Sequence, residues 1–209
     1  INGDGLDDIF VGHGWDTNQG QQGYALIQQT DGSFIVDKSS FYSEIVNYNS
    51  HMLLDVALVD VNNDGYDDII GGYDGDVTSP IFLNDNGTFS KNNIITLPDS
   101  YYGAGNQMHM KTMPADFDQD GDIDLAILWT TANPVYAGNY IQINLNDGQG
   151  NYTDVTNLIP GNAFQDAYQP KLTWVEPWQM IDVNFDGHID IAGSRSDVNG
   201  NYTVDPVVY

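Results

Sequence analysis

The fold is decided by one stretch of the sequence, Asp60-Val61-Asn62-Asn63-Asp64-Gly65-Tyr66-Asp67-Asp68, which runs directly into the apolar pair Ile69-Ile70. Side chains that carry oxygen stand at its first, third, fifth and ninth positions, and glycine stands at its sixth. A short loop wraps a hard cation in this way, because alternate side chains point inward while glycine takes the sharp turn. The backbone carbonyl of the seventh residue and the ninth side chain complete the ligand shell. The stretch therefore predicts a metal loop followed by a buried strand.

The same nine-residue pattern occurs four times along the chain. We number the copies in chain order as Asp loops: loop 1 covers residues 1–8 and lacks its first position, and loops 2, 3 and 4 cover residues 60–68, 116–124 and 182–190. We expect these loops to hold three to four calcium ions. The expected ligands, with the residue that offers its carbonyl last in each set, are Asn2, Asp4, Asp8 and Leu6 in loop 1; Asp60, Asn62, Asp64, Asp68 and Tyr66 in loop 2; Asp116, Asp118, Asp120, Asp124 and Asp122 in loop 3; and Asp182, Asn184, Asp186, Asp190 and His188 in loop 4.

Calcium is favoured over other metals and over other loop types. Several carboxylates in a flexible loop suit calcium better than the smaller magnesium ion. Zinc prefers His or Cys, but the chain has no Cys, and His188 stands where only the backbone carbonyl is used. An EF-hand needs Glu at the twelfth position, where this chain has Gly71, Ile127 and Gly193. Because loop 1 has lost one carboxylate, we expect it to bind its ion more weakly than the others.

The composition excludes several classes of partner. The chain has 30 acidic residues against 5 Lys and Arg, which gives a net charge of −25. Such a surface repels nucleic acid and anionic membranes. No apolar run reaches the ~18 residues of a membrane span, so membrane insertion is not expected. The absence of Cys excludes disulfides and Cys nucleophiles and fits an exported bacterial protein, extracellular or on the cell surface.

The segments around the Asp loops repeat one order of strands. The first positions Asp60, Asp116 and Asp182 are 56 and 66 residues apart, a period that is typical of arrays and propellers. In each repeat an apolar strand precedes the loop and a second strand follows it. A third and a fourth come later, joined by Asn-Gly or Asp-Gly turns that tolerate positive φ. No segment of helical length shows a sustained 3.6-residue period. The predicted fold is therefore all-β, with four antiparallel strands in each blade of a partial β-propeller.

The strand pattern also predicts where the blades begin and end. We expect partial blades at 1–50 and 174–209 and complete blades at 51–107 and 108–173. Closed propellers use about 4–8 blades, so two complete and two partial blades do not close a ring by themselves. The chain is therefore expected to be one propeller segment of a longer protein, or to pack its open ends against other copies of itself.

At the Asp loops the sequence resembles the FG-GAP/VCBS repeat family, the calcium-loop propeller blades of integrin α-subunits and of many secreted bacterial proteins. The resemblance covers essentially the whole chain and rests on the segment from Leu58 to Gly72 and its three counterparts. The turns before Phe34, Phe89 and Tyr152 are also similar to the family's Asn-Asp-Gly-x-Gly-x-Phe hairpin. Gly71-Gly72-Tyr73 replaces the integrin-type Gly-Ala-Pro, which places the chain nearer the bacterial branch. The resemblance implies structural calcium and an extracellular setting, but no single activity.

The favoured function is a non-catalytic, extracellular calcium-binding module for adhesion or protein interaction. The alternative is a carbohydrate-binding or polysaccharide-degrading propeller, a lectin or a lyase, whose active residues lie on surface loops or missing blades. No Gly-x-Ser-x-Gly, P-loop or dinucleotide fingerprint is present. The aromatic residues that could stack on a sugar are Trp15, Trp129, Tyr136, Tyr140, Trp174 and Trp178, although such residues more often fill the core between blades.

Few other residues stand out from the acidic background. Only Glu44 and Glu176 are acids other than Asp, and Glu176 lies between Trp174 and Trp178 as the one aromatic-flanked candidate for acid–base chemistry. His51 and His109 precede the first Asp of their loops by nine and seven residues, which keeps them on the same strand face. We expect both histidines to be structural.

Overall fold

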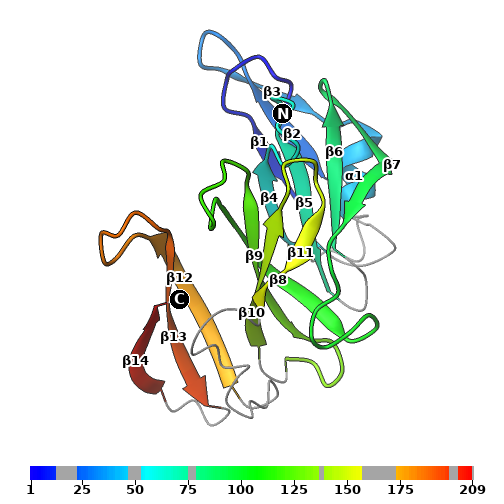
Figure 1. Cartoon of the computed structure of the whole chain (residues 1–209). Helices are drawn as coiled ribbons and strands as arrows, with labels where there is room; N and C mark the ends of the chain where they lie inside the picture. Colours follow the sequence, from blue (N-terminus) through cyan, green and yellow to red (C-terminus); the bar gives the residue numbers. More distant parts are fainter. Residues whose placement is uncertain are drawn as a thin grey trace.

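The computed structural model describes residues 1–12, 23–46, 53–74, 79–136, 139–156, 173–197 and 202–208. These residues form four antiparallel sheets that follow one another along the chain, which we call blades 1 to 4 (Figure 1). Blade 1 contains β1 (Ile9–Val11), β2 (Tyr24–Gln28) and β3 (Phe34–Asp37); blade 2 contains β4 (Leu53–Val59), β5 (Asp68–Tyr73), β6 (Pro80–Asp85) and β7 (Thr88–Thr96); blade 3 contains β8 (Gln107–Ala115), β9 (Asp124–Thr131), β10 (Asn139–Asn146) and β11 (Tyr152–Asp154); blade 4 contains β12 (Thr173–Ile181), β13 (Asp190–Asp197) and β14 (Tyr202–Val208). The all-β fold with two four-stranded and two three-stranded sheets is thus confirmed, and within the described residues the sheets do not close a ring.

The hairpin turns have the backbone that their sequences predict. Asn86 and Gly87, between β6 and β7, have φ angles of 53° and 82°. Positive φ at both central residues matches the right-handed twist of the flanking strands. Asp85 and Thr88 accordingly face each other across the turn.

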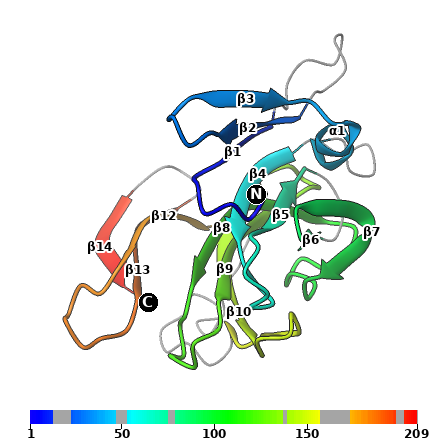
Figure 2. The same ribbon diagram turned by 90° about the horizontal axis from the view of Figure 1, so that it is seen from above.

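Neighbouring blades pack face to face around three apolar clusters (Figure 2). On β5 of blade 2, Ile69 packs toward blade 1 with Phe10, while Ile70 packs toward blade 3 with Leu125. Each such side chain contributes roughly 1.5–3 kcal/mol when it is fully buried. Because these strands are buried on both faces, they are apolar at successive positions rather than at alternate ones.

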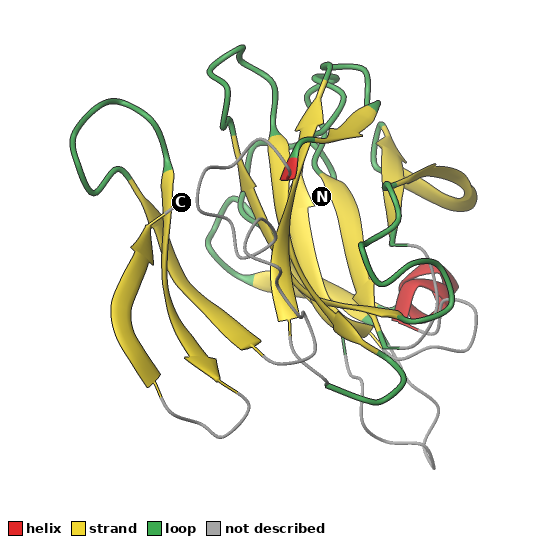
Figure 3. Ribbon diagram, turned by 60° about the horizontal axis from the view of Figure 1, so that its bottom comes forward, coloured by secondary structure: helices red, strands yellow, loops and turns green. Residues whose placement is uncertain are grey.

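One element was not expected from the sequence. Helix α1 (Ser40–Val46) follows blade 1 and lies beside β7 and β2 (Figure 3). It is seven residues long, too short for a sustained 3.6-residue period. Its buried residues Tyr42, Ile45 and Val46 nevertheless have the i, i+3, i+4 spacing of one helix face and pack into the cluster between blades 1 and 2. In the part of the chain that the structure describes, no helix has the length and apolarity that a membrane span requires.

Candidate metal centres

Asp loops 2, 3 and 4 each join the first strand of a blade to the second, and loop 1 precedes β1, so all four lie at the upper ends of their sheets in Figure 1. Loops 2, 3 and 4 each begin where an apolar strand ends and close with the Asp that starts the next strand. The sheet therefore fixes both ends of the loop, and the residues between them fold back on themselves. This arrangement brings the expected ligands of each loop together.

Within loop 2 the backbone N–H groups bind the side chains that we expect to ligate the ion. The N–H of Asp64 donates to Asp60 Oδ1 and to Asn62 Oδ1, each at 3.1 Å. The N–H of Gly65 donates to Asp60 Oδ2 at 2.8 Å, and that of Tyr66 donates to Asp64 Oδ1 at 2.9 Å. Gly65 has a φ of 91°, a conformation that glycine adopts without strain. The side chains at positions one, three and five are thus held toward one centre.

Loop 4 repeats this pattern bond for bond. The N–H of Asp186 donates to Asp182 Oδ1 at 3.1 Å and to Asn184 Oδ1 at 2.9 Å. The glycine at position six and His188 at position seven donate to positions one and five, both at 2.9 Å. The His188 side chain is exposed. The side chains at positions one, three and five of loop 4 are therefore brought together by the same backbone hydrogen bonds as in loop 2.

Loop 3 contains the strongest indication of a cation. Carboxylate oxygens of Asp116, Asp118 and Asp120 lie within 4.8 Å of one another. Asp116 Oδ1 is buried and accepts no hydrogen bond. A buried carboxylate oxygen without a donor is costly, and like charges at this distance repel. The residues present therefore fit a divalent cation, which would supply the missing partner and neutralise the cluster.

In loops 2 and 3 the Asp at position nine ties the loop to two strands of its blade. Asp68 is fully buried, and its Oδ2 and Oδ1 accept the N–H groups of Val61 (3.0 Å) and Asn84 (2.8 Å). Burial raises the pKa of Asp68 to about 6, an effect to which the charges of Asp64 and Asp60 add.

Asp124, at position nine of loop 3, has the same environment. It accepts the N–H groups of Phe117 and Asn146, each at 2.8 Å. Burial raises the pKa of Asp124 as well. In loop 4, Asp190 accepts the Val183 N–H at 2.9 Å. The ninth position is thus a buried acceptor in all three complete loops.

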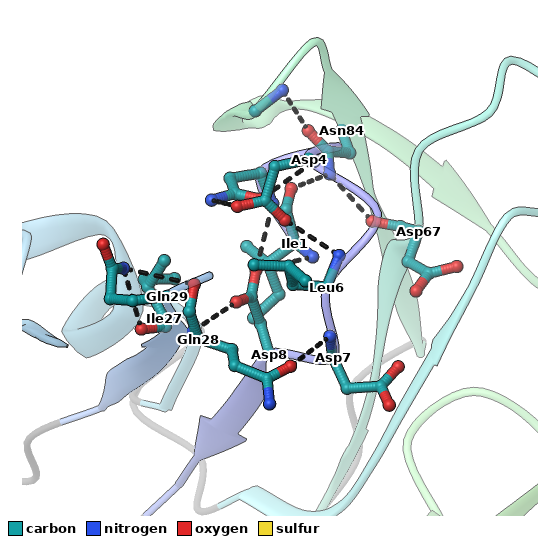
Figure 4. Close-up of polar contacts among 12 residues, drawn as sticks. Ile1, Asp4, Leu6, Asp7, Asp8, Ile27, Gln28, Gln29, Asp67 and Asn84 are labelled. Atoms are coloured by element: carbon teal, nitrogen blue, oxygen red, sulfur yellow. Dashed lines mark hydrogen bonds and ion pairs between the residues drawn. The ribbon is translucent and has the colours of Figure 1, made fainter. Parts of the chain in front are cut away.

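Loop 1 keeps this geometry from its second residue onward (Figure 4). Asp4 N–H donates to Asn2 Oδ1 at 3.1 Å, and Leu6 N–H donates to Asp4 Oδ1 at 2.9 Å. Asp8 Oδ2 accepts the N–H of Asn2 at 3.3 Å, and Asp8 Oδ1 accepts the N–H of Gln28 at 2.9 Å. The three expected side-chain ligands Asn2, Asp4 and Asp8 therefore belong to one hydrogen-bonded loop, as in the complete copies.

Neighbouring loops are joined by contacts that the sequence analysis did not predict. Asn63 Nδ2 in loop 2 donates to Asp122 Oδ1 in loop 3 at 2.6 Å. Gln119 Nε2 in loop 3 donates to the Gly187 carbonyl in loop 4 at 2.6 Å. Both donors stand at position four with positive φ. The Asp122 side chain is turned toward loop 2, in keeping with the expectation that position seven offers its own loop only a carbonyl.

Of the two histidines singled out in the sequence, only His109 lies among the described residues, and it lies in the interface between two blades. His109 is buried between Ser79 Oγ (2.6 Å) and Thr112 Oγ1 (2.8 Å), and burial lowers its pKa to about 3. It is a structural histidine, as expected. His51, Trp15 and the side chains of Glu44, Trp174, Glu176 and Trp178 lie outside the described residues.

Two of the aromatic residues that could have stacked on a sugar instead fill the core between blades, the place where such residues are more often found. Trp129 is fully buried in the cluster between blades 2 and 3, where its Nε1 donates to Gln142 Oε1 at 2.5 Å. Tyr140 is buried in the same cluster. Both fill the interface between blades, because each stands on a central strand that is covered on both faces. Tyr136, on the turn after β9, is 43% exposed.

Antiparallel sheets of up to four strands, packed face to face around a shared core, define a β-propeller-type binding module. Residues 60–127, from the start of loop 2 into β9, match the model of the FG-GAP-like repeat, and this part of the chain belongs to that family.

No curated protein matches the sequence. A solved structure of an Agrocybe aegerita lectin, described as the basis of its specific recognition of non-reducing terminal N-acetylglucosamine, is similar to this chain at 16% sequence identity and a TM-score of 0.48. The match covers 98% of this chain and 52% of the lectin, so the chain spans about half the length of that protein.

Proposed function

We propose that this chain is a calcium-binding propeller module that acts outside the cell in adhesion or protein interaction. The observation that carries the proposal is loop 3, where three carboxylates gather within 4.8 Å and Asp116 Oδ1 is buried without a hydrogen-bond donor. Loops 2 and 4 support it through the same arrangement of positions one, three and five. Extracellular calcium is abundant enough to fill even the weak sites that are common in extracellular modules.

A bound cation would contribute charge neutralisation and cross-linking rather than a chemical reaction. In loop 2 the ligands would be Asp60, Asn62, Asp64, Asp68 and the Tyr66 carbonyl, which connect the end of β4 to the start of β5. Asp68 also accepts the N–H of Asn84 at the end of β6. Ion binding would therefore fix three strands of the blade and the loop surface between them.

The test compares two neighbouring carboxylates of loop 3 by calcium titration calorimetry of the full chain. Asp120→Ala removes an expected ligand and should weaken one site about tenfold or more, which corresponds to ~1.4 kcal/mol. Asp122→Ala removes a side chain that faces Asn63 instead of its own loop, so it should change that affinity far less. Equal losses for the two variants, or tighter binding of magnesium than of calcium, would contradict the proposal.

A saccharide array and a polysaccharide cleavage assay, both with the calcium-loaded chain, distinguish this function from that of a lectin or a lyase. For an adhesion or protein-interaction module we expect no binding on a saccharide array and no cleavage of uronate-containing polysaccharides. Calcium-dependent binding to a defined glycan would replace this function with that of a lectin. Polysaccharide cleavage would replace it with that of a lyase.

A further inference from the structure

A single asparagine joins Asp loop 3 to Asp loop 2. Asn146 stands at the end of β10 and is 5% exposed. Its backbone N–H donates to Asp124 Oδ1 at 2.8 Å. Its side-chain Nδ2 donates to the Val61 carbonyl in loop 2 at 2.7 Å and to the Ile123 carbonyl at 3.1 Å, while Oδ1 accepts the Gly150 N–H at 3.1 Å. Both donors and the acceptor of this amide are thus used.

Asn84 makes the same four bonds one blade earlier. Its N–H donates to Asp68 Oδ1 at 2.8 Å. Its Nδ2 donates across the interface to the Ile1 carbonyl at 2.8 Å and within its blade to the Asp67 carbonyl at 2.9 Å. Its Oδ1 accepts the Gly87 N–H at 2.8 Å. Figure 4 shows Asn84 between loop 1 and Asp67. We call Asn84 and Asn146 the blade-linking asparagines.

The bonds of Asn146 connect two expected metal ligands in different loops. Asp124 Oδ1 accepts the Asn146 backbone N–H, and the Asn146 side chain binds the Val61 carbonyl. The N–H of Val61 in turn donates to Asp68 Oδ2 at 3.0 Å. Every step of this path is a hydrogen bond of ordinary length between buried groups, so displacement of either carboxylate strains the other.

Blade 1 has a glutamine where blades 2 and 3 have the asparagine. Gln28 stands at the equivalent place, since its backbone N–H donates to Asp8 Oδ1 at 2.9 Å. Its longer side chain turns back, and Oε1 accepts the N–H of Asp7 in its own loop at 3.0 Å. The backbone bond therefore belongs to all three blades, whereas Gln28 stands in the first blade and its side chain binds its own loop instead of the loop of a preceding blade.

We propose that the blade-linking asparagines couple ion binding between neighbouring loops, so that an ion in loop 3 raises the affinity of loop 2 for its own ion. The proposal rests on the proposed function, because it requires that ions fill the loops. An ion in loop 3 fixes Asp124, and Asn146 then holds the Val61 residue and with it Asp68 in the geometry that loop 2 needs. Part of the ordering of loop 2 is thereby completed before its own ion binds. By linkage, an ion in loop 2 must favour loop 3 by the same factor.

The experiment measures the calcium affinity of loop 2 in the full chain with loops 1 and 4 disabled by Asp4→Ala and Asp186→Ala. In this background, Asp120→Ala weakens loop 3 about tenfold or more, so that loop 2 is titrated while loop 3 is largely empty, and we expect the affinity of loop 2 to fall about fivefold or more. When Asn146→Ala is also present, Asp120→Ala should no longer change the affinity of loop 2. Asn144→Ala is the matched control. Asn144 is a buried amide on the same strand whose side chain makes no hydrogen bond, so the coupling should persist in this variant.

Hydrogen exchange at the Val61 amide supplies a second readout. Filling loop 3 should slow exchange at Val61 in the parent and in Asn144→Ala, but not in Asn146→Ala. Should Asn146→Ala fail to fold, Asn146→Gln repeats the test with the side chain that blade 1 carries. An effect of Asp120→Ala that is equal with and without Asn146, or absent while loop 2 still binds calcium, overturns the coupling. Absence of binding in every loop instead overturns the proposed function.

Discussion

Asp loops 2 and 4 have the same internal hydrogen bonds and different neighbours. In both, the N–H of position five binds positions one and three, and the glycine N–H binds position one. Val61, at position two of loop 2, is fully buried against blade 3, whereas Val183 at the same position of loop 4 is 41% exposed. Phe185, at position four, is 91% exposed. Hydrogen bonds within the loop therefore determine its shape, whereas packing against the following blade determines how far its outer residues are buried.

All loops share a cluster of carboxylates, so removing the ions should destabilise the folded chain as a whole. This is the largest effect that we expect. An ion that binds only the folded chain stabilises it by roughly 2.7 kcal/mol per site at a hundredfold excess over Kd. Without ions, the repulsion among the gathered carboxylates acts on the folded state alone. Replacing calcium with a chelator should lower the melting temperature by more than about 10 °C in a calorimetric scan. A melt that does not respond to the chelator would show that the loops fold without cations.

The next prediction tests whether burial alone distinguishes loops 2 and 4. Val61→Asp places a charge in a fully buried interface and should cost about 3–5 kcal/mol of unfolding free energy. Val183→Asp makes the same change at the same loop position, but on a half-open surface, and should stay within about 0.5 kcal/mol at chain concentrations too low for association. Denaturant unfolding of both variants in excess calcium measures the difference. Similar losses would mean that position two acts through its own loop and not through the neighbouring blade.

This contrast also separates what the sequence predicts from what it does not. The path of each loop follows from contacts within nine residues, and the order of strands follows from hairpins between strands that are neighbours in the sequence, so patterns in the sequence suffice. The sequence shows that Asn84 and Asn146 precede turns. It does not show their bonds to Ile1 and Val61, which join residues that are 83 and 85 positions apart. Nothing in a one-dimensional pattern states which residue of another blade lies opposite. For the same reason the sequence alone does not decide whether Trp129 lies in the core, where such residues are more often found, or stacks on a sugar at the surface.

A third prediction concerns the open face of loop 4, and we expect it to bind a second copy of this chain. Blade 3 covers Val61 in blade 2, so the equivalent Val183 offers a surface that fits another blade of the same kind. The opposite end carries the matching surface. Ile9 on β1 is 47% exposed, whereas Ile69 at the equivalent position of blade 2 is fully buried. Blade 1 of one copy can therefore pack on blade 4 of the next, a head-to-tail contact that joins unlike surfaces.

Light scattering on the calcium-loaded chain of residues 1–209 measures this association. We expect assemblies larger than a monomer. Val183→Asp and Ile9→Asp, on the two opposite surfaces, should each raise the dissociation constant roughly 30-fold, which corresponds to about 2 kcal/mol. A parent chain that stays monomeric would contradict the prediction, and so would an assembly that neither substitution affects.

The smallest effect that we predict is a pH dependence of the unfolding free energy, which arises in the interface between blades 2 and 3 that buries Val61. His109 lies between Ser79 of blade 2 and Thr112 of blade 3, against the ring of Trp129, and burial lowers its pKa to about 3. Asp55 lies on the same interface, where it accepts the Thr112 N–H at 2.6 Å, and burial raises its own pKa.

The direction of the effect follows from proton uptake. The unfolded chain protonates His109 near its ordinary pKa of 6.5, whereas the folded chain keeps it neutral down to about 3. The contribution of His109 to stability is therefore complete above pH 6.5 and is lost as the pH falls below it, by at most about 1.4 kcal/mol per pH unit. His109→Gln cannot titrate, so the stability advantage of the parent over this variant should shrink between pH 7 and pH 5. Urea unfolding of both proteins in excess calcium measures that gap, and because Asp55 and the loops are present in both, their titration cancels. A gap that stays constant across this range would mean that His109 takes up its proton in the folded chain, and that the interface over Val61 admits water.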